Sequence, residues 1–459
     1  MSKKFPLWAG AAQVDITPAM GTQIAGDIGR RRPVEEIRDP LYAKALVLDT
    51  GGKRACWLSL DVLAISRRWA DEIRGQAAQR FGLDADAVMV HVVQNHAAPS
   101  VGHCFVWEDD CRWFPREYPW LIGGDDRYNP MAVEGTLKAV EGALAALQPA
   151  TLKVGRGVDG RVAFNRRFIM RDGSGRTHPP TCDPNILCNE GPIDPEVGVM
   201  LLAGKDGKPL AACLHHTCHP VHGYPQRWVS AGWPGAWSDG ARRLFGNDCV
   251  ALVFNGFCGN IHYHNHLDPA PRDDYIEMGR KLTESTERIL PELRAVDDPV
   301  LDWRVRNMRI PMRCPTDAEI AAAGQLLAKH PQPIWKDEAK TAVEWDWVYA
   351  ATRLDLKEHY DRDPMFDYIL QLFRLGDVAL VVAGGEPFVE EQLRIKRESP
   401  APFTFTAHMS NGYVGYIPTR EALMHGGYET WTGNGYKLAS EALQMIGDAS
   451  LAMIRELFA

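Results

Sequence analysis

The sequence lacks the features of several large classes of protein. None of its 459 residues falls in a run that approaches the roughly 20 apolar residues of a membrane span, and the N-terminus MSKKFPLWAG has no apolar segment of signal-peptide length. No basic tract interleaved with aromatic residues occurs, and Lys and Arg number 51 against 59 Asp and Glu. This balance argues against nucleic acid or an anionic membrane as the main partner. We therefore expect a cytoplasmic protein without a membrane span.

The cysteines form neither a disulfide framework nor a zinc finger. The 10 cysteines include no Cys-x-x-Cys pair, and disulfides are rare in cytosolic proteins. We interpret them as buried thiols, with one alternative: Cys182 and Cys188 are close enough in sequence to form a local bridge. Internal repeats and low-complexity linkers are also missing, and the length suffices for one large or two moderate domains.

Hydrophobic periodicity predicts alternating strands and helices. Residues 43–49 and 54–61 have the pattern of two strands joined by a glycine hairpin. A helix follows over 66–81, with Ser66 as its N-cap and Gly82 as its stop signal. Further elements with clear periodicity are helices at 131–147, 234–245 and 273–290 and strands at 197–202, 209–214, 250–255 and, as the last buried strand, 377–383. This alternation is typical of an α/β protein.

Polar side chains gather at the ends of several predicted strands. Four histidines lie at and just past the end of the apolar run 209–214, and a Gln-Asn-His tripeptide follows the run 87–93. Ligands bind at strand ends in α/β sheets. A single histidine is most often a hydrogen-bonded structural residue, but this density favours metal binding or acid–base chemistry. The side chains concerned are Gln94, Asn95, His96, His215, His216, His219, His222, Asn260, His262, His264, His266 and Glu386.

Arginines and tryptophans are further candidate contacts. Arg166 and Arg167 end an extended stretch and could neutralise a carboxylate of the substrate. Trp107 lies in a long aromatic loop and Trp233 lies near the histidine-rich strand end. An indole at such a place can stack on a sugar, line an acyl pocket or anchor its loop. The charge run 30–32, Arg-Arg-Arg, predicts a solvated surface, with a grip on an anionic group as the alternative.

The order of the motifs resembles one enzyme family. From Val14 to Glu429 the chain reads VDITP, IRDPLYAKALVL, SLDVL, QNHAAPS, FNRR, GPIDPEVGVM, LHHTCHPV, SAGWPG, FNGFCGN, GGEPFVE, NGYVGYIPT and GGYE. This series resembles the neutral/alkaline non-lysosomal ceramidase family, whose members are zinc-dependent amidases that cleave the N-acyl bond of ceramide. The resemblance implies a single ceramidase-like catalytic domain over residues 1–459, an α/β fold with mixed β-sheets flanked by helices. The family's C-terminal immunoglobulin-like domain is expected to be missing, because the sequence stops about thirty residues after Glu429.

The resemblance also implies metal ligands at specific positions. The family's ligand in a His-Pro pair corresponds to His219, and its glutamate and tyrosine ligands correspond to Glu386 and Tyr416. The first histidine of its His-Thr-His motif is replaced by Gln94, and the second corresponds to His96. An amide oxygen is a weaker zinc donor than an imidazole. Three outcomes stay open: zinc held by His96, His219, Glu386 and Tyr416, another divalent ion with Gln94 among its ligands, or no metal.

The remaining candidate roles combine this alignment with the strand ends. Asn260 stands where the family has an aspartate, and the aspartate before the family's helix start is Gly232 here. The catalytic candidates are His96, Asn260, Tyr416 and Arg166. The candidate substrate contacts are Gln94, Asn95, Arg167, His216, His262, His264, Trp107 and Trp233.

Three functions agree with these residues. The first is a metal-dependent hydrolase of an amide or ester bond, with zinc as the expected ion and a substrate other than ceramide, because the tryptophans replace the wide apolar entrance that two alkyl tails need. The second is a carbohydrate-directed hydrolase or a polysaccharide lyase that acts on a uronate-containing glycan by His/Tyr acid–base catalysis without a metal. The third is a binding protein without activity. The expected partner is a small molecule, N-acyl or oligosaccharide; a homo-oligomer is left open.

Overall fold

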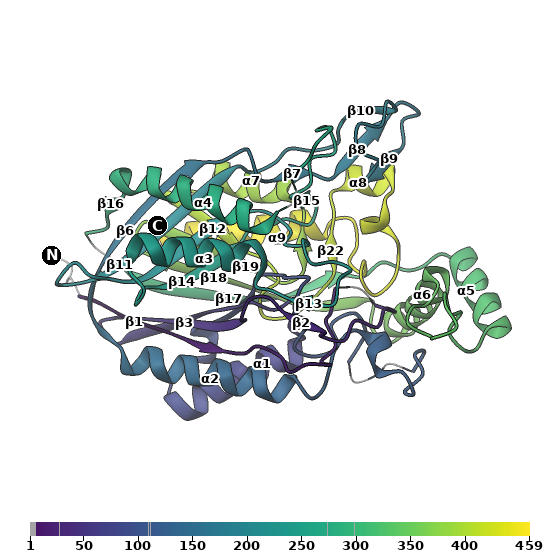
Figure 1. Cartoon of the computed structure of the whole chain (residues 1–459), viewed down its shortest axis with the longest axis horizontal. Coiled ribbons are helices and arrows are strands. Elements are labelled where there is room, and N and C mark those ends of the chain that lie inside the picture. Colours follow the sequence, from purple (N-terminus) through teal and green to yellow (C-terminus); the bar gives the residue numbers. More distant parts are fainter. Residues whose placement is uncertain (1–5, 27, 109, 111, 273, 298) are drawn as a thin grey trace.

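Two stacked β-sheets form the centre of the molecule. The computed structural model describes residues 6–26, 28–108, 110, 112–272, 274–297 and 299–459 (Figure 1). The larger sheet has nine strands, eight of them in the order β14-β12-β11-β6-β1-β3-β4-β5, with β16 paired to β6. Its strands are β1 (Leu7–Asp15), β3 (Tyr42–Thr50), β4 (Lys53–Leu60), β5 (Val88–Val92), β6 (Gln148–Val158), β11 (Glu196–Gly204), β12 (Pro209–His216), β14 (Val250–Asn255) and β16 (Arg294–Ala295).

The smaller sheet packs face to face on the larger one. Its order is β17-β18-β19-β21, and its strands are β17 (Leu301–Pro311), β18 (Met365–Leu375), β19 (Val378–Ala383) and β21 (Phe403–Ala407). The layer between the sheets is apolar, and Trp57 of β4 sits at its centre with ring centroids 5.9 Å from Phe254 and 5.7 Å from Phe373. The strand β19, in which every residue is buried, reads as a continuous apolar run, as expected of a strand covered on both faces.

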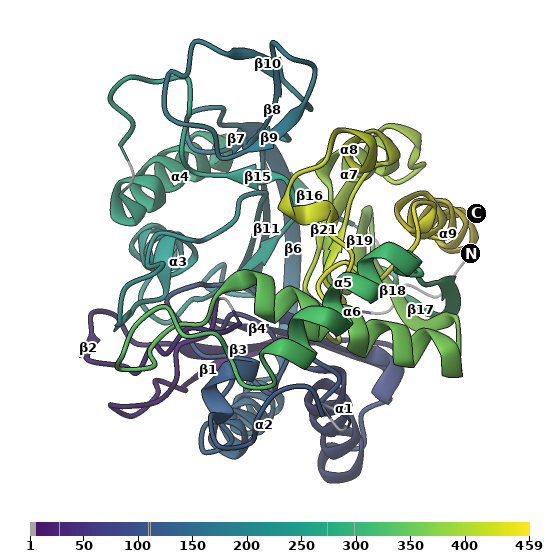
Figure 2. The ribbon, with the colours of Figure 1, turned by 90° about the vertical axis from the view of Figure 1, so that its right-hand side faces the viewer.

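Helices cover both outer faces, which gives four layers (Figures 1 and 2). On the larger sheet these are α1 (Arg67–Phe81), α2 (Asn129–Ala145), α3 (Gly232–Phe245) and α4 (Tyr275–Ile289); on the smaller sheet they are α7 (Val389–Glu398) and α9 (Ala442–Phe458). The mixed α/β fold predicted from the sequence is therefore confirmed. No helix in the described ranges has the length and apolar character needed to cross a bilayer.

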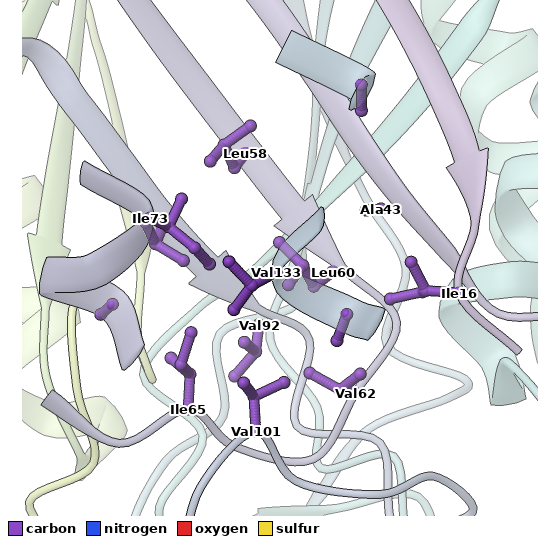
Figure 3. Close-up of a cluster of buried hydrophobic side chains, with 14 of the residues drawn as sticks. Ile16, Ala43, Leu58, Leu60, Val62, Ile65, Ile73, Val92, Val101 and Val133 are labelled. Atoms are coloured by element: carbon purple, nitrogen blue, oxygen red, sulfur yellow. The ribbon is translucent and has the colours of Figure 1, made fainter. Parts of the chain in front are cut away.

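The core under α1 and α2 also fixes the loops that carry the site. Figure 3 shows Leu58 and Leu60 of β4, Val92 of β5, Ile73 of α1 and Val133 of α2 converging in one cluster. The same cluster contains apolar residues from the segments that follow β4 and β5, namely Val62, Ile65 and Val101. The strand-end loops are thus anchored in the core rather than free.

Short elements surround one end of the two sheets. They are α5 (Asp317–Lys329), α6 (Trp345–Arg362), α8 (Arg420–His425) and a small sheet of β8 (Arg167–Met170), β9 (Gly175–Thr177) and β10 (Ile186–Asn189). Three short strand pairs are β2 (Glu36–Ile37) with β13 (Trp228–Val229), β7 (Phe164–Asn165) with β15 (Ile261–His262), and β20 (Glu386–Pro387) with β22 (Tyr416–Ile417). The 3-10 helices are η1 (Ala85–Ala87), η2 (Pro119–Ile122), η3 (Leu290–Glu292) and η4 (Tyr428–Thr430).

Several local expectations differ from the structure. Ser66 precedes α1 as expected, but its side chain makes no cap; the hydroxyl donates to Glu108 Oε2 at 2.5 Å. The strand β19 is not the last buried strand, because β21 pairs with it in parallel register. The signal of β21 is short and follows a proline-rich turn, which hides it in the sequence. Cys182 and Cys188 are free and exposed.

Candidate active site

A cavity of about 670 Å³ lies where the short strand pairs meet the ends of the long strands. It is lined by side chains from the segment after β5, the loop after β12, β15, β20, β22, α6 and η4. The structure brings together seven of the side chains predicted from the sequence, although they come from distant parts of the chain. These are Gln94, His96, Arg166, His219, His262, Glu386 and Tyr416.

The segment after β5 delivers two of these side chains in an unusual conformation. Gln94 is buried and has a φ of 67°, a left-handed value that is uncommon for a residue with a side chain. Its Oε1 lies 3.7 Å from the Cys258 Sγ and accepts from that thiol. Backbone conformations of this kind cost energy and cluster at functional sites.

His96 is held by its backbone while its ring is left unpaired. Arg32 NH2 donates to the His96 carbonyl at 3.1 Å and Arg32 Nε donates to the Gln226 carbonyl at 3.0 Å. The solvated surface predicted for the 30–32 run is therefore wrong for Arg32, which is 1% exposed. Both ring nitrogens of His96 are buried and have no hydrogen-bond partner among the described residues. A buried imidazole without a partner is costly, which indicates that a ligand completes it.

His219 presents one ring nitrogen to Glu386. Its Nδ1 lies 3.2 Å from the Cys258 carbonyl oxygen. Because a carbonyl only accepts, the Nδ1 carries the proton and the Nε2 keeps its lone pair. That Nε2 lies 3.5 Å from Glu386 Oε2, and the ring centroids of His96 and His219 are 5.2 Å apart. His219 Nε2 and the Glu386 carboxylate thus face each other, with the His96 ring beside them.

Tyrosines bracket Glu386. The strands β20 and β22 are parallel and set Glu386 opposite Tyr416, and the Tyr413 hydroxyl donates to Glu386 Oε1 at 3.0 Å. Gly385 makes this approach possible: it has a φ of 74°, and a Cβ there would lie 2.6 Å from the Gly415 carbonyl oxygen. Glu386 Oε2 makes no hydrogen bond within the described part of the chain.

Burial sets the charges of these groups. It lowers the pKa of His96 to about 3, assisted by the positive charges of Arg32 and Arg166, and it lowers the pKa of His219 well below its usual value. Burial also raises the pKa of Glu386 to about 6, against the opposing effect of Arg166 and of neighbouring polar side chains. Both imidazoles are therefore neutral at pH 7, while the carboxyl group titrates just below it.

Arg166 enters the cavity wall as part of a buried ion network. Its Nε donates to Glu429 Oε1 at 3.0 Å, and its guanidinium lies over the rings of Tyr416 and Tyr428 at 5.4 and 5.3 Å. Arg167 faces away from the cavity and pairs with the other Glu429 oxygen at 2.8 Å. Glu429 is fully buried, and its role in this network was not predicted from the sequence. The arginines of the FNRR motif and the glutamate of the distant GGYE motif are the residues that could have indicated it.

Two polar candidates lie outside the cavity and support its loops. Asn95 donates to the Ser230 carbonyl oxygen at 2.5 Å and so ties the His96 turn to the start of α3. Asn260 donates to Glu390 Oε2 at 3.0 Å and accepts from the Val389 amide, which positions the start of α7. These contacts use the polar atoms of both side chains, so neither is directed at a substrate.

Four aromatic candidates also lie outside the cavity. His216 Nδ1 donates to the Glu196 carbonyl at 3.1 Å, and its ring packs against the buried Trp233. His264 Nε2 lies 3.1 Å from the Thr181 hydroxyl. Trp107 stacks on His359 with ring centroids 3.9 Å apart. His216 and Trp233 pack between β12 and α3, and His264 and Trp107 lie in loops, so none of the four lines the cavity.

The aromatic side of the cavity was missed by sequence reasoning. It consists of residues from α6 and from the C-terminal loops, namely Trp345, Tyr349, Tyr413, Tyr428, Trp431 and Tyr436. The signal was present in the aromatic density of the segment GGYETWTGNGY. Without the fold, nothing in the sequence places that segment opposite α6.

The side chains fit a metal ion in chemistry and in one spacing. Two donors about 2.0–2.1 Å from a tetrahedral zinc lie about 3.3 Å apart, close to the 3.5 Å between His219 Nε2 and Glu386 Oε2. The unpaired nitrogens of His96 are available beside them. Across the described ranges, no three His, Cys, Asp or Glu side chains are already grouped as ligands. His219 and Glu386 therefore have the spacing of two ligands of one ion, whereas no third ligand among the described residues is yet at that spacing.

Two solved ceramidase structures share this fold. Neutral ceramidase from Pseudomonas aeruginosa matches with a TM-score of 0.74 at 20% sequence identity, over 99% of this chain and 74% of that chain. A ceramidase complexed with C2 matches with a TM-score of 0.73 at 18% identity, over 99% of this chain and 75% of that one. No protein-family model and no curated protein sequence matches the chain. The ceramidase-like fold expected from the motif order is therefore confirmed.

Proposed function

We propose that this chain, which has the ceramidase fold, is a hydrolase of the neutral ceramidase family that cleaves an amide or ester bond. The observation that carries the proposal is the buried pair of His219 and Glu386, with the unpaired His96 beside it and Tyr413 and Tyr416 around it. Neutral imidazoles, a carboxyl group near neutrality and two phenols are the groups that hydrolysis of an acyl bond needs.

A zinc ion would be held by His96, His219, Glu386 and Tyr416. When bound, zinc lowers the pKa of a coordinated water to about 7 and so supplies a nucleophile at neutral pH. The carbonyl of Cys258 keeps the His219 Nε2 free of a proton and aimed at the ion. Tyr413 holds the Glu386 carboxylate in one orientation through its hydroxyl.

The other groups act on the substrate. Arg166 places a buried positive charge at the cavity wall, where it can stabilise the oxyanion that forms when an acyl carbon is attacked. The Tyr416 hydroxyl, which burial keeps protonated by raising its pKa, lies opposite Glu386 in the β20–β22 pair and would donate a proton to the leaving group where it does not bind the ion. The aromatic lining and the limited volume of the cavity favour a substrate other than a lipid with two alkyl tails.

We expect a chelator to abolish hydrolysis of N-acyl amides and esters by the wild-type protein, and zinc to restore it. The reason is that the zinc held by these side chains would supply the hydroxide that attacks the acyl carbon at pH 7. Initial rates with and without chelator, together with elemental analysis of the same samples, measure this. Unchanged rates in chelator-treated protein that contains no metal would contradict the proposal.

A second function is favoured by one observation, the missing third ligand. In that case His96 and Tyr416 act as base and acid on a uronate-containing glycan, with Arg166 neutralising the uronate. Turnover of a uronate-containing oligosaccharide to an unsaturated product in the presence of chelator would establish this function. The chelator experiment thus separates the two candidates.

Gln94→His is expected to increase zinc occupancy. Gln94 lies beside the cavity groups and contributes a weak amide donor, whereas an imidazole there would supply the nitrogen ligand that the pair lacks. Zinc content after dialysis against a fixed free-zinc buffer is the measurement, and Gln94→Asn, which keeps the amide, is the matched control. An occupancy that does not rise in the histidine variant would place the metal elsewhere or nowhere.

A further inference from the structure

The mouth of the cavity carries three aromatic side chains that no catalytic step uses. Trp345 stacks on Tyr349 with ring centroids 5.6 Å apart, and Trp431 meets Tyr349 edge-on at 4.8 Å. We call these three residues the aromatic platform. All three line the cavity, and Trp431 is 44% exposed. Burial of a large aromatic side chain stabilises a protein, so an exposed one at a cavity mouth indicates a binding site.

Anchoring of α6 does not explain the platform. Trp347, on another face of the same helix, is 1% exposed and donates its indole N–H to the His330 carbonyl at 2.9 Å. Trp347 therefore already fixes α6 to α5. Trp345 and Tyr349 are four residues apart, so they share the opposite side of the helix and turn toward the cavity.

A carboxylate stands beside the platform. Asp346 is exposed, lines the same cavity, and takes part in no hydrogen bond or ion pair with the residues that the structure describes. An aromatic face beside a free carboxylate is complementary to a sugar ring, which has both an apolar C–H face and hydroxyl groups. The C–H face of a pyranose stacks on the ring, and its hydroxyl groups donate to the carboxylate.

The same residues argue against other occupants. An acyl chain at this place would strip water from the Asp346 carboxylate without replacing its hydrogen bonds. A uronate would bring a second negative charge next to it, in a protein whose formal net charge is already -8. A neutral sugar or an amino sugar would hydrogen-bond to the Asp346 carboxylate and would not repel it.

The platform is continuous with the catalytic groups. Tyr436 lines the cavity between them and stacks on Tyr416 with ring centroids 5.5 Å apart and an interplanar angle of 11°. Tyr416 in turn lies opposite Glu386 in the β20–β22 pair. We infer that the platform and Asp346 form a subsite for a neutral or amino sugar, so that the hydrolysed amide or ester is attached to a sugar. The second half of this statement rests on the proposed function; the sugar binding does not.

The test measures binding apart from turnover. The full chain with Glu386→Gln is titrated by calorimetry with an N-acetylglucosamine tetrasaccharide, with a cello-oligosaccharide of the same length and with an oligogalacturonate. We expect one of the two uncharged oligosaccharides to bind, and the oligogalacturonate to bind at least tenfold more weakly. Adding Trp431→Ala or Asp346→Asn should weaken the binding about tenfold, the equivalent of one lost stacking or hydrogen-bond contact. Trp8→Ala, at an indole that is 41% exposed outside the cavity, is the matched control.

Each outcome decides the inference. No binding of either uncharged oligosaccharide, equal or tighter binding of the oligogalacturonate, or binding unaffected by Trp431→Ala and Asp346→Asn would overturn it. Sugar binding that depends on the platform in a protein that hydrolyses no sugar amide or ester would uphold the subsite and refute the proposed function. Hydrolysis of simple N-acyl amides without any sugar binding would support the proposed function and refute the subsite.

Discussion

Glu386→Gln is expected to lower kcat by about three powers of ten while the protein stays folded. Its carboxylate faces His219 Nε2 and is oriented by the Tyr413 hydroxyl, so it acts directly on the metal or the substrate. An amide keeps the shape but loses the charge and the basicity. The measurement is kcat and KM on the substrate identified in the chelator experiment, with circular dichroism to verify the fold.

A matched control for this change is Glu390→Gln. Burial raises the pKa of Glu390 too, but its carboxylate accepts from Asn260 and does not line the cavity. We expect Glu390→Gln to keep most of the activity. If the two variants lost activity equally, Glu386 would be a structural residue of the β20–β22 region rather than a catalytic one.

Glu386→Gln is also expected to change the free energy of unfolding of the metal-free protein in a pH-dependent way. Burial raises the pKa of Glu386 from 4.5 to about 6, so the folded state binds the proton more tightly than the unfolded state does. That contribution to stability is complete below pH 4.5 and is lost as the pH rises through 6. At pH 8 the buried charge therefore costs about 2 kcal/mol, which Glu386→Gln removes, whereas at pH 4 the two proteins should be equally stable. Urea unfolding at both pH values measures this.

Glu429→Gln is expected to lower the free energy of unfolding by about 3–5 kcal/mol. Its carboxylate is fully buried and accepts from Arg166 at 3.0 Å, from Arg167 at 2.8 Å and from Thr177 at 2.6 Å. Loss of its charge leaves the buried Arg166 without an ion-pair partner among the described residues, and leaves Arg167 with Glu190 alone. Removing one member of a buried ion network costs this much because the remaining charges stay out of water.

Urea unfolding of Glu429→Gln should be compared with that of Glu36→Gln. Glu36 pairs with Arg38 at 3.0 Å on the surface, with 56% and 42% of the two side chains exposed, and exposed pairs contribute about 0–1 kcal/mol. A loss in Glu429→Gln no larger than the loss in Glu36→Gln would mean that the network is solvated and contributes little to stability.

The parts of the site that were predictable are those encoded by a local pattern. An apolar run followed by polar residues marks a strand end, and this pattern located His96, His219 and Glu386 before the structure was known. The same pattern could not separate His219 from His216, three residues away. His216 belongs to β12 and its ring packs on α3, whereas His219 lies beyond the strand and turns to the cavity. The direction in which a side chain points at a strand end depends on the conformation of the following loop. That conformation cannot be predicted from the local pattern.

The fold was predictable through the order of its motifs, and the aromatic side of the cavity was not. The motif order carries the fold even at 20% sequence identity to a solved ceramidase. The helix α6 and the segment after η4 carry the aromatic platform, and they meet only through tertiary packing. Local periodicity gives their existence and type but not their contact, because that contact joins Tyr349 to Trp431, far along the chain.

The bond between Arg166 and Glu429 has a consequence for biosynthesis. Its two residues are 263 positions apart, and ribosomes add about 5–20 residues per second. Roughly 15 to 50 seconds therefore pass between the synthesis of Arg166 and that of its partner. His219 is added early in that interval, whereas Glu386 and Tyr416 are added near its end and Glu429 completes it. The full set of site residues is therefore present only after these late elements have been synthesised.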